Sequence, residues 1–309
     1  MRESVGKRFV CGSVCLFLTL SVIVLAFCGC QKTPGEHKFT IGMSQCNLGE
    51  PYREKMNSDI ALAAKNHPEI KVVFKDAQND VLKQRAHVEE MISAGYDLIL
   101  ISPKESTPLT EPVAKAMDAG IPVIVLDRAV DGEKYTCFIG ADNKKIGEAA
   151  GNWIKEVLGG KGKVVELQGL MTSRPGVERH EGFLKGIEGS EIDVIFAVDM
   201  KWLEPDARKE MESALARFPE IDLVFAHNDP GAHGAYLAAK AANREKKMKF
   251  VGIDALPSEG QMYVKNGILD ATFEYPTGGK EAIETALKIL SGEDVEKTIT
   301  LPSRSFIKE

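Results

Sequence analysis

The stretch PVIVLDRAVDG (122–132) joins an unbroken apolar run to an acid–base pair, Asp127 and Arg128. An apolar run without alternation indicates a strand that is buried on both faces, which is typical of a parallel sheet flanked by helices. The charged pair stands where such a strand leaves the sheet. It is either a strand-end ion pair that only solvates the chain, or half of a recognition site.

Similar apolar runs recur along the chain from residue 38 onward, and helical patterns separate most of them. The predicted strands are 39–44, 71–76, 98–103, 122–127, 136–141, 163–168, 193–198, 222–227, 249–254, 271–275 and 298–302. The predicted helices include 52–66, 79–94, 111–119, 143–157, 205–217, 230–242 and 277–291. Because so many strands are unusual for one twisted open sheet, we predict an α/β fold of two doubly wound, Rossmann-like lobes.

The two lobes are expected to divide at GADNKKIG (140–147), where a strand passes directly into a helix. We assign residues 39–141 and 275–298 to the N-terminal lobe, 142–274 to the C-terminal lobe, and 299–309 to a C-terminal return strand. The chain then crosses between the lobes several times. Both sets of carboxyl strand ends can face one cleft, and ligands of such folds bind at those ends.

Residues 1–30 have the layout of an export signal, with a basic start, an apolar stretch over 9–27 and a small-residue exit. Gly29 precedes Cys30, and a polar tether over 31–38 follows, so this stretch resembles a bacterial lipoprotein signal in which Cys30 is acylated, as by palmitate, after cleavage. The apolar stretch is also long enough to remain as an uncleaved membrane anchor. Both alternatives place the protein outside the cytoplasm, in the periplasm or on the outer face of the membrane.

Net charge, cysteine spacing and one glycine-rich motif each argue against a different kind of site. The net charge of −6 becomes about −8 without the signal, whereas a nucleic-acid binder needs a basic stripe. Besides Cys30, the exported chain keeps Cys46 and Cys137, which form no disulfide framework or zinc-type spacing and are interpreted as small apolar packing residues. The motif GGKGK (159–163) lacks the spacing of a phosphate loop and is interpreted as a turn.

Polar side chains follow several predicted strands at the points where the strands end. They are Gln45 to Arg53, Asp76, Ser102, Asp127 with Arg128, Asn228 with Asp229, Asp254 and Glu274. Each one alone fits the N-cap of the next helix. Gathered at one edge, carboxylates, guanidinium groups and an amide would suit the mixed donors and acceptors of a sugar or polyol. Tyr52 and Trp202 lie near these positions and offer aromatic faces for sugar C–H groups.

With Asp-Arg after the fourth strand, FAHND (225–229) and FVGID (250–254), the chain resembles the periplasmic sugar-binding proteins of ABC transporters, of the ribose-binding kind, over roughly residues 38–305. SQCNLGEPYRE (44–54), together with ADN and VVELQG further on, is similar to the galactofuranose-binding branch. The resemblance implies a type I periplasmic binding protein fold, in which two lobes joined by a three-strand hinge close on one monosaccharide.

The resemblance also implies which side chains hold the sugar. They are Tyr52, Arg53, Asp127, Arg128, Arg179, Trp202, Asn228, Asp254 and Glu274. Three features depart from the ribose proteins: Ser102 replaces an asparagine, NLGE (47–50) lengthens the first loop, and Arg174 is added. These departures leave the sugar open among pentoses, hexoses, furanose forms and polyols.

The expected function is that of a monomeric solute-binding protein that delivers its sugar to an ABC transporter permease, without cofactor or metal. A sensor role, with the liganded protein presented to a chemoreceptor or sensor kinase, would use the same residues. We do not expect an enzyme, because G-x-S-x-G and H-E-x-x-H motifs are absent and His227 and His233 flank a helix start rather than a metal site. A transcriptional regulator would need a DNA-binding head where the export signal stands.

Overall fold

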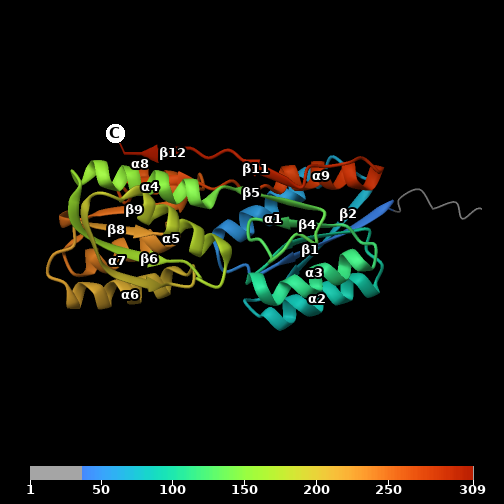
Figure 1. The fold of residues 1–309 in the computed structure, drawn as a ribbon, viewed down its shortest axis with the longest axis horizontal. Coiled ribbons are helices and arrows are strands. Elements are labelled where there is room, and N and C mark those ends of the chain that lie inside the picture. Colours follow the sequence, from blue (N-terminus) through green and yellow to red (C-terminus); the bar gives the residue numbers. More distant parts are fainter. Residues whose placement is uncertain (1–36, 309) are drawn as a thin grey trace, which may run out of the picture. The chain divides into compact units, whose positions relative to one another are not determined.

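The structure is a computed structural model that describes residues 37–308. The predicted export signal and the acylation of Cys30 lie outside the described residues. Within them the chain forms two six-stranded sheets, each covered by helices on both faces (Figure 1).

The first sheet is parallel throughout, with the strand order β11-β5-β4-β3-β1-β2. Its strands are β1 (Phe39–Gln45), β2 (Ile70–Asp76), β3 (Leu98–Ser102), β4 (Val123–Leu126), β5 (Cys137–Ala141) and β11 (Thr298–Leu301). Its helices pack in two pairs, α1 (Pro51–Ala64) with α9 (Gly279–Ser291), and α2 (Val81–Ser93) with α3 (Ser106–Asp118). We call this unit the N-terminal lobe.

The second sheet has the strand order β12-β10-β9-β8-β6-β7, and only β12 runs antiparallel to its neighbour. Its strands are β6 (Lys161–Gln168), β7 (Glu191–Asp199), β8 (Leu223–Ala226), β9 (Lys249–Asp254), β10 (Ala271–Glu274) and β12 (Ser305–Ile307). Its helices are α4 (Asn143–Val157), α5 (Arg174–Gly186), α6 (Glu204–Arg217), α7 (Asp229–Ala241) and α8 (Gly260–Lys265). We call this unit the C-terminal lobe.

The apolar strands are buried on both faces, as their unbroken sequences predict. Side chains alternate across a strand, so Leu98 and Leu100 of β3 join one hydrophobic cluster while Ile99 and Ile101 join another on the opposite face. The first of these clusters extends into the C-terminal lobe, where it includes Phe225. The two lobes therefore share one apolar layer.

The chain passes from one lobe to the other three times: at Asp142 between β5 and α4, over 275–278 between β10 and α9, and over 302–304 between β11 and β12. The predicted fold of two doubly wound lobes joined by three connections is confirmed. The segment expected to return as one strand over 299–309 instead forms two short strands, one in each sheet. Pro302 separates them because proline has no N–H group to continue a ladder.

Three local expectations were tested by the structure. Helix α3 begins at Ser106, earlier than the predicted 111, because Pro108 lies in the first turn, where a missing N–H group costs nothing. Cys46 and Cys137 are buried free thiols, as expected of packing residues. Over residues 37–308, none of the helices combines the length and apolar character needed to cross a bilayer.

Candidate functional site

A cavity lies between the two lobes, at the carboxyl ends of their strands. Its walls are formed by Glu50, Tyr52, Arg53, Asp127, Arg128, Pro175, Arg179, Trp202, Asn228 and Asp254. The volume of the cavity is only about 10 Å³. The lobes therefore approach each other closely around this cavity.

Asp127 and Arg128 follow β4 and are nearly fully buried, yet they are not each other's main partners. Arg53, in the first turn of α1, donates a short hydrogen bond to the Asp127 carboxylate and another to Ser102 Oγ at 2.9 Å. Arg128 Nε lies 3.8 Å from that carboxylate, and its Nη1 donates to the carbonyl of Lys104 at 3.3 Å. A strand-end ion pair alone does not describe this arrangement.

Arg179 is the corresponding buried arginine of the C-terminal lobe. It extends from α5, donates from Nε to Asn143 Oδ1 at 2.9 Å, and donates from Nη1 to the backbone carbonyl of His227. Its Nη1 lies 3.4 Å from Asp254 Oδ1. Three groups from different elements thus fix the orientation of this guanidinium group.

The fully buried carboxylate of Glu166, on β6, positions the histidine whose backbone carbonyl accepts from Arg179. It accepts hydrogen bonds from His180 Nδ1 and His227 Nε2, both at 2.9 Å. Burial by itself would raise the pKa of Glu166, but the two histidines lower it to about 2. The anchored His227 ring holds the loop whose carbonyl accepts from Arg179.

Asn228 combines two roles that the sequence left as alternatives. Its side-chain oxygen accepts from the backbone N–H of Gly231 at 2.9 Å and so caps α7, as predicted for the start of this helix. Its amide nitrogen donates to the carbonyl of Trp202 at 3.0 Å. One residue therefore begins a helix and holds an aromatic wall of the cavity.

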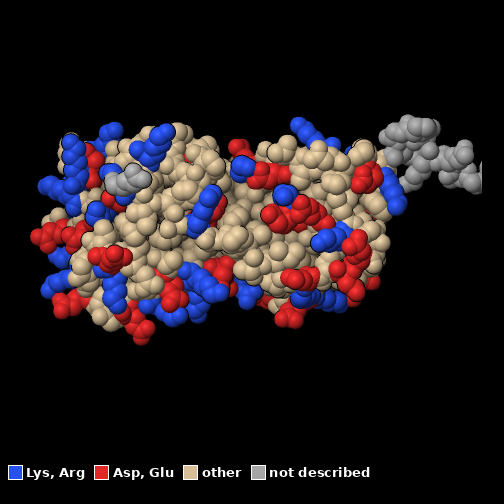
Figure 2. All heavy atoms as spheres, turned by 90° about the horizontal axis from the view of Figure 1, so that it is seen from above, with Lys and Arg blue, Asp and Glu red and all other residues tan. Residues whose placement is uncertain are grey.

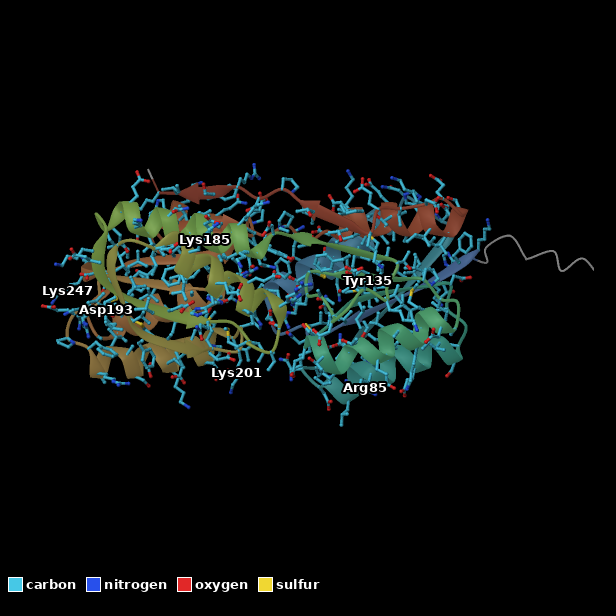
Figure 3. All side chains as sticks on the ribbon, in the orientation of Figure 1. Arg85, Tyr135, Lys185, Asp193, Lys201 and Lys247 are labelled. Carbon is cyan, nitrogen blue, oxygen red and sulfur yellow. The ribbon has the colours of Figure 1, made fainter. Side chains whose placement is uncertain are left out.

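Trp202 contacts one arginine from each lobe. The guanidinium carbons of Arg128 and Arg179 each lie 5.4 Å from its ring centroid, within the range of cation–π attraction. The connection that carries it includes the exposed Lys201, labelled in Figure 3, and both residues have left-handed backbone. The indole N–H is buried without a hydrogen-bond partner in the described structure.

The electrostatics of the cavity are unbalanced at Asp254. Burial raises the pKa of this carboxyl to about 7, and Asp127 adds to the rise, while Arg179 opposes it. Burial by itself would lower the pKa of the Arg53 guanidinium group, but the attraction of Asp127 together with those of Cys46, Glu50 and Tyr52 raises it. Asp254 is therefore the cavity carboxyl whose charge changes near neutral pH.

The structure brings together eight of the nine side chains named from the sequence. Glu274 is the exception, since its Oε2 accepts from Arg304 Nε at 2.8 Å and the residue lines a separate surface groove. The next residue, Tyr275, points the other way: its hydroxyl donates to the Asp127 carbonyl at 3.1 Å, and its ring centroid lies 5.0 Å from the Arg179 guanidinium carbon. The site contact expected of Glu274, the last residue of β10, is thus made by the residue that follows the strand.

Two wall residues were not named as site residues from the sequence. Glu50 lies in the inserted NLGE segment, and Pro175 lies at the start of α5. The sequence signals for Glu50 were the insertion and its place within the polar range 45–53 that follows the first strand. No comparable signal marks Pro175, which reads as an ordinary proline at the first turn of a helix.

Two further features of the described residues concern surface charge and metal ligands. Figure 2 shows basic and acidic side chains interspersed over the face that it displays. Within residues 37–308, no group of three or more His, Cys, Asp or Glu side chains is arranged to hold a metal ion.

Comparison with known proteins relates the chain to binding proteins. Residues 41–294 match the family model described as periplasmic binding protein domain. The ribose import binding protein of Bacillus subtilis (strain 168) is 32% identical over 300 residues, which are 94% of this chain and 97% of that protein.

Two solved structures extend the likeness. The fructose-binding periplasmic domain of a hybrid two-component system is 43% identical, with a TM-score of 0.85 over 87% of this chain and 91% of that one. A Mycobacterium smegmatis protein in complex with β-D-fucofuranose is 30% identical, with a TM-score of 0.83 over 87% and 91% of the two chains. All three of these proteins are similar to this chain over most of its length.

Proposed function

Since the chain belongs to the periplasmic binding protein domain family, we propose that it binds one monosaccharide in the cavity between its lobes. It is a sugar-binding periplasmic protein of the ribose-binding kind, and its relatives are binding proteins rather than enzymes. The observation that carries the proposal is the cavity itself, where three carboxylates, three guanidinium groups, an amide and two aromatic rings from both lobes converge.

The unpaired groups in this cavity favour a ligand rich in hydroxyl groups. Arg128 Nε, Arg128 Nη2 and Trp202 Nε1 are buried donors without a hydrogen-bond partner in the described structure. A buried donor left unmatched costs about 1–3 kcal/mol, so a ligand that supplies acceptors gains this energy. The carboxylates of Asp127 and Asp254 would in turn accept from the hydroxyl groups of the same sugar.

We propose a sugar in its furanose ring form, with D-fructose as the first candidate. Support comes from the likeness to a fructose-binding domain and to a protein solved with a fucofuranose. The ring would lie against Tyr52 and Trp202, and Asp127, Arg128, Arg179, Asn228 and Asp254 would hold its hydroxyl groups.

Entry of the sugar requires the lobes to separate. The cavity now has about the least room that holds one water molecule, and a monosaccharide is far larger. The three connections between the lobes would serve as the hinge, with the lobe limits 39–141 plus 275–298 and 142–274 proposed from the sequence. A sugar that bridges both lobes stabilises the closed state by its extra contacts there.

After closure, the loaded protein would deliver its sugar to an ABC transporter permease. A lipid on Cys30 would keep the monomer at the membrane; mass spectrometry of the N-terminal peptide from a membrane fraction tests this directly. A second candidate is the presentation of the loaded protein to a sensor kinase, which the likeness to the domain of a two-component system favours. Deleting the gene separates the two, because a transport role predicts lost sugar uptake and a sensor role predicts lost sugar-induced transcription.

A thermal-shift screen with D-fructose, D-ribose, L-arabinose, D-galactose and myo-inositol tests sugar binding. We expect D-fructose to raise the midpoint of unfolding in proportion to the logarithm of its concentration, because a ligand that binds only the folded state stabilises it in that way. Sucrose at equal concentration is the control for non-specific stabilisation. If none of the monosaccharides exceeds sucrose, the protein does not bind a monosaccharide and the proposal fails.

A further inference from the structure

The cavity is lined by equal numbers of acidic and basic side chains, which balance in charge when Asp254 is ionised. Three acids and three arginines line it, and each is at most 8% exposed. The six residues are Glu50, Asp127, Asp254, Arg53, Arg128 and Arg179. An unpaired charge is costly to bury, so any ligand that carries charge disturbs this balance.

The side chain of Glu50 does not cap the helix that it precedes. It precedes α1 but its side chain accepts no N–H group of the helix, whereas Asp80 at the start of α2 accepts from two such groups. Instead Glu50 Oε1 accepts from Asn47 Nδ2 at 2.7 Å, and Oε2 lies 3.3 Å from Arg53 Nε and 3.5 Å from Arg128 Nη2. The carboxylate is directed toward two arginines of the cavity rather than toward its own helix.

Without Glu50, Arg128 would have only a distant counter-charge. Asp127 lies 3.8 Å from its Nε and is already engaged by Arg53, and among residues 37–308 neither Nε nor Nη2 of Arg128 has a hydrogen-bond partner. A planar guanidinium group with two free N–H groups is the geometry that binds a carboxylate or phosphate in a bidentate manner. Glu50 occupies the neighbourhood where such an anion would bind.

We propose that Glu50 is a specificity-determining residue that restricts the cavity to uncharged sugars. The inference rests on the proposed function and goes beyond it by assigning the rejection of anionic sugars to one side chain. Its carboxylate completes the balance of three acids against three arginines, so a sugar acid or sugar phosphate would add an unpaired buried negative charge. Replacing it by a neutral residue would leave one arginine in excess, and that excess matches an anion.

The test compares D-fructose with D-fructuronate, which carries a carboxylate at C6, by titration calorimetry at pH 8. At this pH the Asp254 carboxyl is mostly ionised. We expect the wild type to bind D-fructose at least 100-fold more tightly than D-fructuronate. In Glu50→Gln this preference should fall at least tenfold, because the variant leaves the cavity with one net positive charge.

Glu105→Gln is the matched control. Glu105 also occupies the N-cap of a helix, α3, without capping it, but it pairs with Lys104 at 3.3 Å and does not line the cavity. This variant should keep the wild-type preference. Two further variants keep the test valid if Glu50→Gln does not fold. The double variant Glu50→Gln/Arg128→Gln removes one charge of each sign and should tolerate D-fructuronate better than Arg128→Gln alone, again by at least tenfold.

The outcomes separate the two proposals. An unchanged preference in Glu50→Gln, or in the double variant relative to Arg128→Gln, overturns the role of Glu50 and leaves sugar binding intact. If the wild type binds D-fructose and D-fructuronate equally well, the role of Glu50 is likewise overturned and sugar binding stands. If the wild type binds no monosaccharide in the thermal-shift screen, the proposed function itself fails, and the inference fails with it.

Discussion

At the scale of single residues, backbone strain gathers at the cavity. Asp127, Trp202 and Asp254 have φ angles of 60°, 68° and 116°, which residues other than glycine rarely adopt. Each such residue costs of the order of 1–3 kcal/mol and persists only where its surroundings hold it in place. The hydrogen bonds from Tyr275 to the Asp127 carbonyl and from Asn228 to the Trp202 carbonyl do so here. The left-handed backbone at these three residues directs their side chains into the cavity.

Replacing Asp127 by asparagine should weaken sugar binding. The change keeps the shape of the side chain but leaves the Arg53 guanidinium group without its closest counter-charge. We expect a loss of about 2–5 kcal/mol, roughly 30-fold to several thousand-fold in affinity, measured by titration calorimetry. Asp131→Asn, an exposed residue of the same loop, is the control. A loss below tenfold for Asp127→Asn would remove this residue from the site.

Replacing Asp254 by asparagine should change how stability depends on pH. Because its folded-state pKa is raised to about 7 from 3.8, the folded protein keeps a proton that the unfolded chain releases between about pH 4 and 7. The wild type therefore loses stability from this group as pH rises through that window, and Asp254→Asn does not. Chemical denaturation at pH 5 and pH 8 measures the effect.

We expect the stability of Asp254→Asn relative to the wild type to rise between these two pH values, by roughly 2–4 kcal/mol. At pH 5 the Asp254 carboxyl of the folded wild type is protonated, so the variant removes a charged partner of Arg179 only at pH 8, and the trend between the two pH values is the informative quantity. A difference that stays constant from pH 5 to pH 8 would contradict the raised pKa.

At the scale of elements, the position of Trp202 depends on a glycine in a different connection. Gly169 directly follows β6, and a Cβ atom there would lie only 2.1–2.3 Å from carbons of the indole ring. No Cβ atom in a real protein approaches a ring so closely. The absence of a side chain at the end of one strand thus makes room for the aromatic wall carried by the next loop.

Gly169→Ala should therefore displace the indole and weaken binding, although residue 169 itself does not line the cavity. We expect an affinity loss similar to that of Trp202→Ala, and quenching of tryptophan fluorescence by iodide should increase because the ring moves from its buried position. Trp153, which is partly buried elsewhere, supplies a background signal that stays constant. Wild-type affinity in folded Gly169→Ala would show that the ring is not needed where it lies.

At the scale of the whole described chain, the contacts that hold the lobes together are few near the cavity. Trp202 contacts Arg128 across the lobes, and the N–H of Ser106 donates to the carbonyl of Thr172 at a long 3.4 Å. The connection 275–278 is held more firmly, since Tyr52 donates to the carbonyl of Pro276 at 3.0 Å. This distribution of contacts favours a motion in which the lobes separate at the cavity while the connections between them stay in place.

Small-angle X-ray scattering should detect this motion. We expect the radius of gyration of the sugar-free protein to exceed that of the protein saturated with its sugar, because the sugar bridges both lobes and shifts the population to the closed form. Asp127→Asn at the same sugar concentration should show a smaller decrease, since less of it is occupied. Identical curves with and without a bound sugar would exclude a hinge of this kind.

Much of the architecture could be predicted from the sequence because local patterns decide it. Unbroken apolar runs such as 98–102 and 123–126 require burial on both faces, and only helices on both sides of a parallel sheet provide it. The cluster of polar strand ends followed from the same topology, since the carboxyl ends of parallel strands meet at one edge. The sequence did not predict that the segment 298–307 forms two strands. Their pairing partners, β5 for β11 and β10 for β12, lie far away in the chain.

The sequence by itself indicated two lobes with several crossings between them and polar side chains at the strand ends, and its resemblance to a known family implied three connections and most of the side chains that face the cavity. Only the tertiary structure decided how these side chains pair. It gave Asp127 to Arg53 rather than to its neighbour Arg128, turned Glu274 toward Arg304, and directed Glu50 into the cavity. The reason is physical: periodicity and burial act within an element, whereas the partner of a buried charge depends on which elements the fold brings within a few ångströms of it.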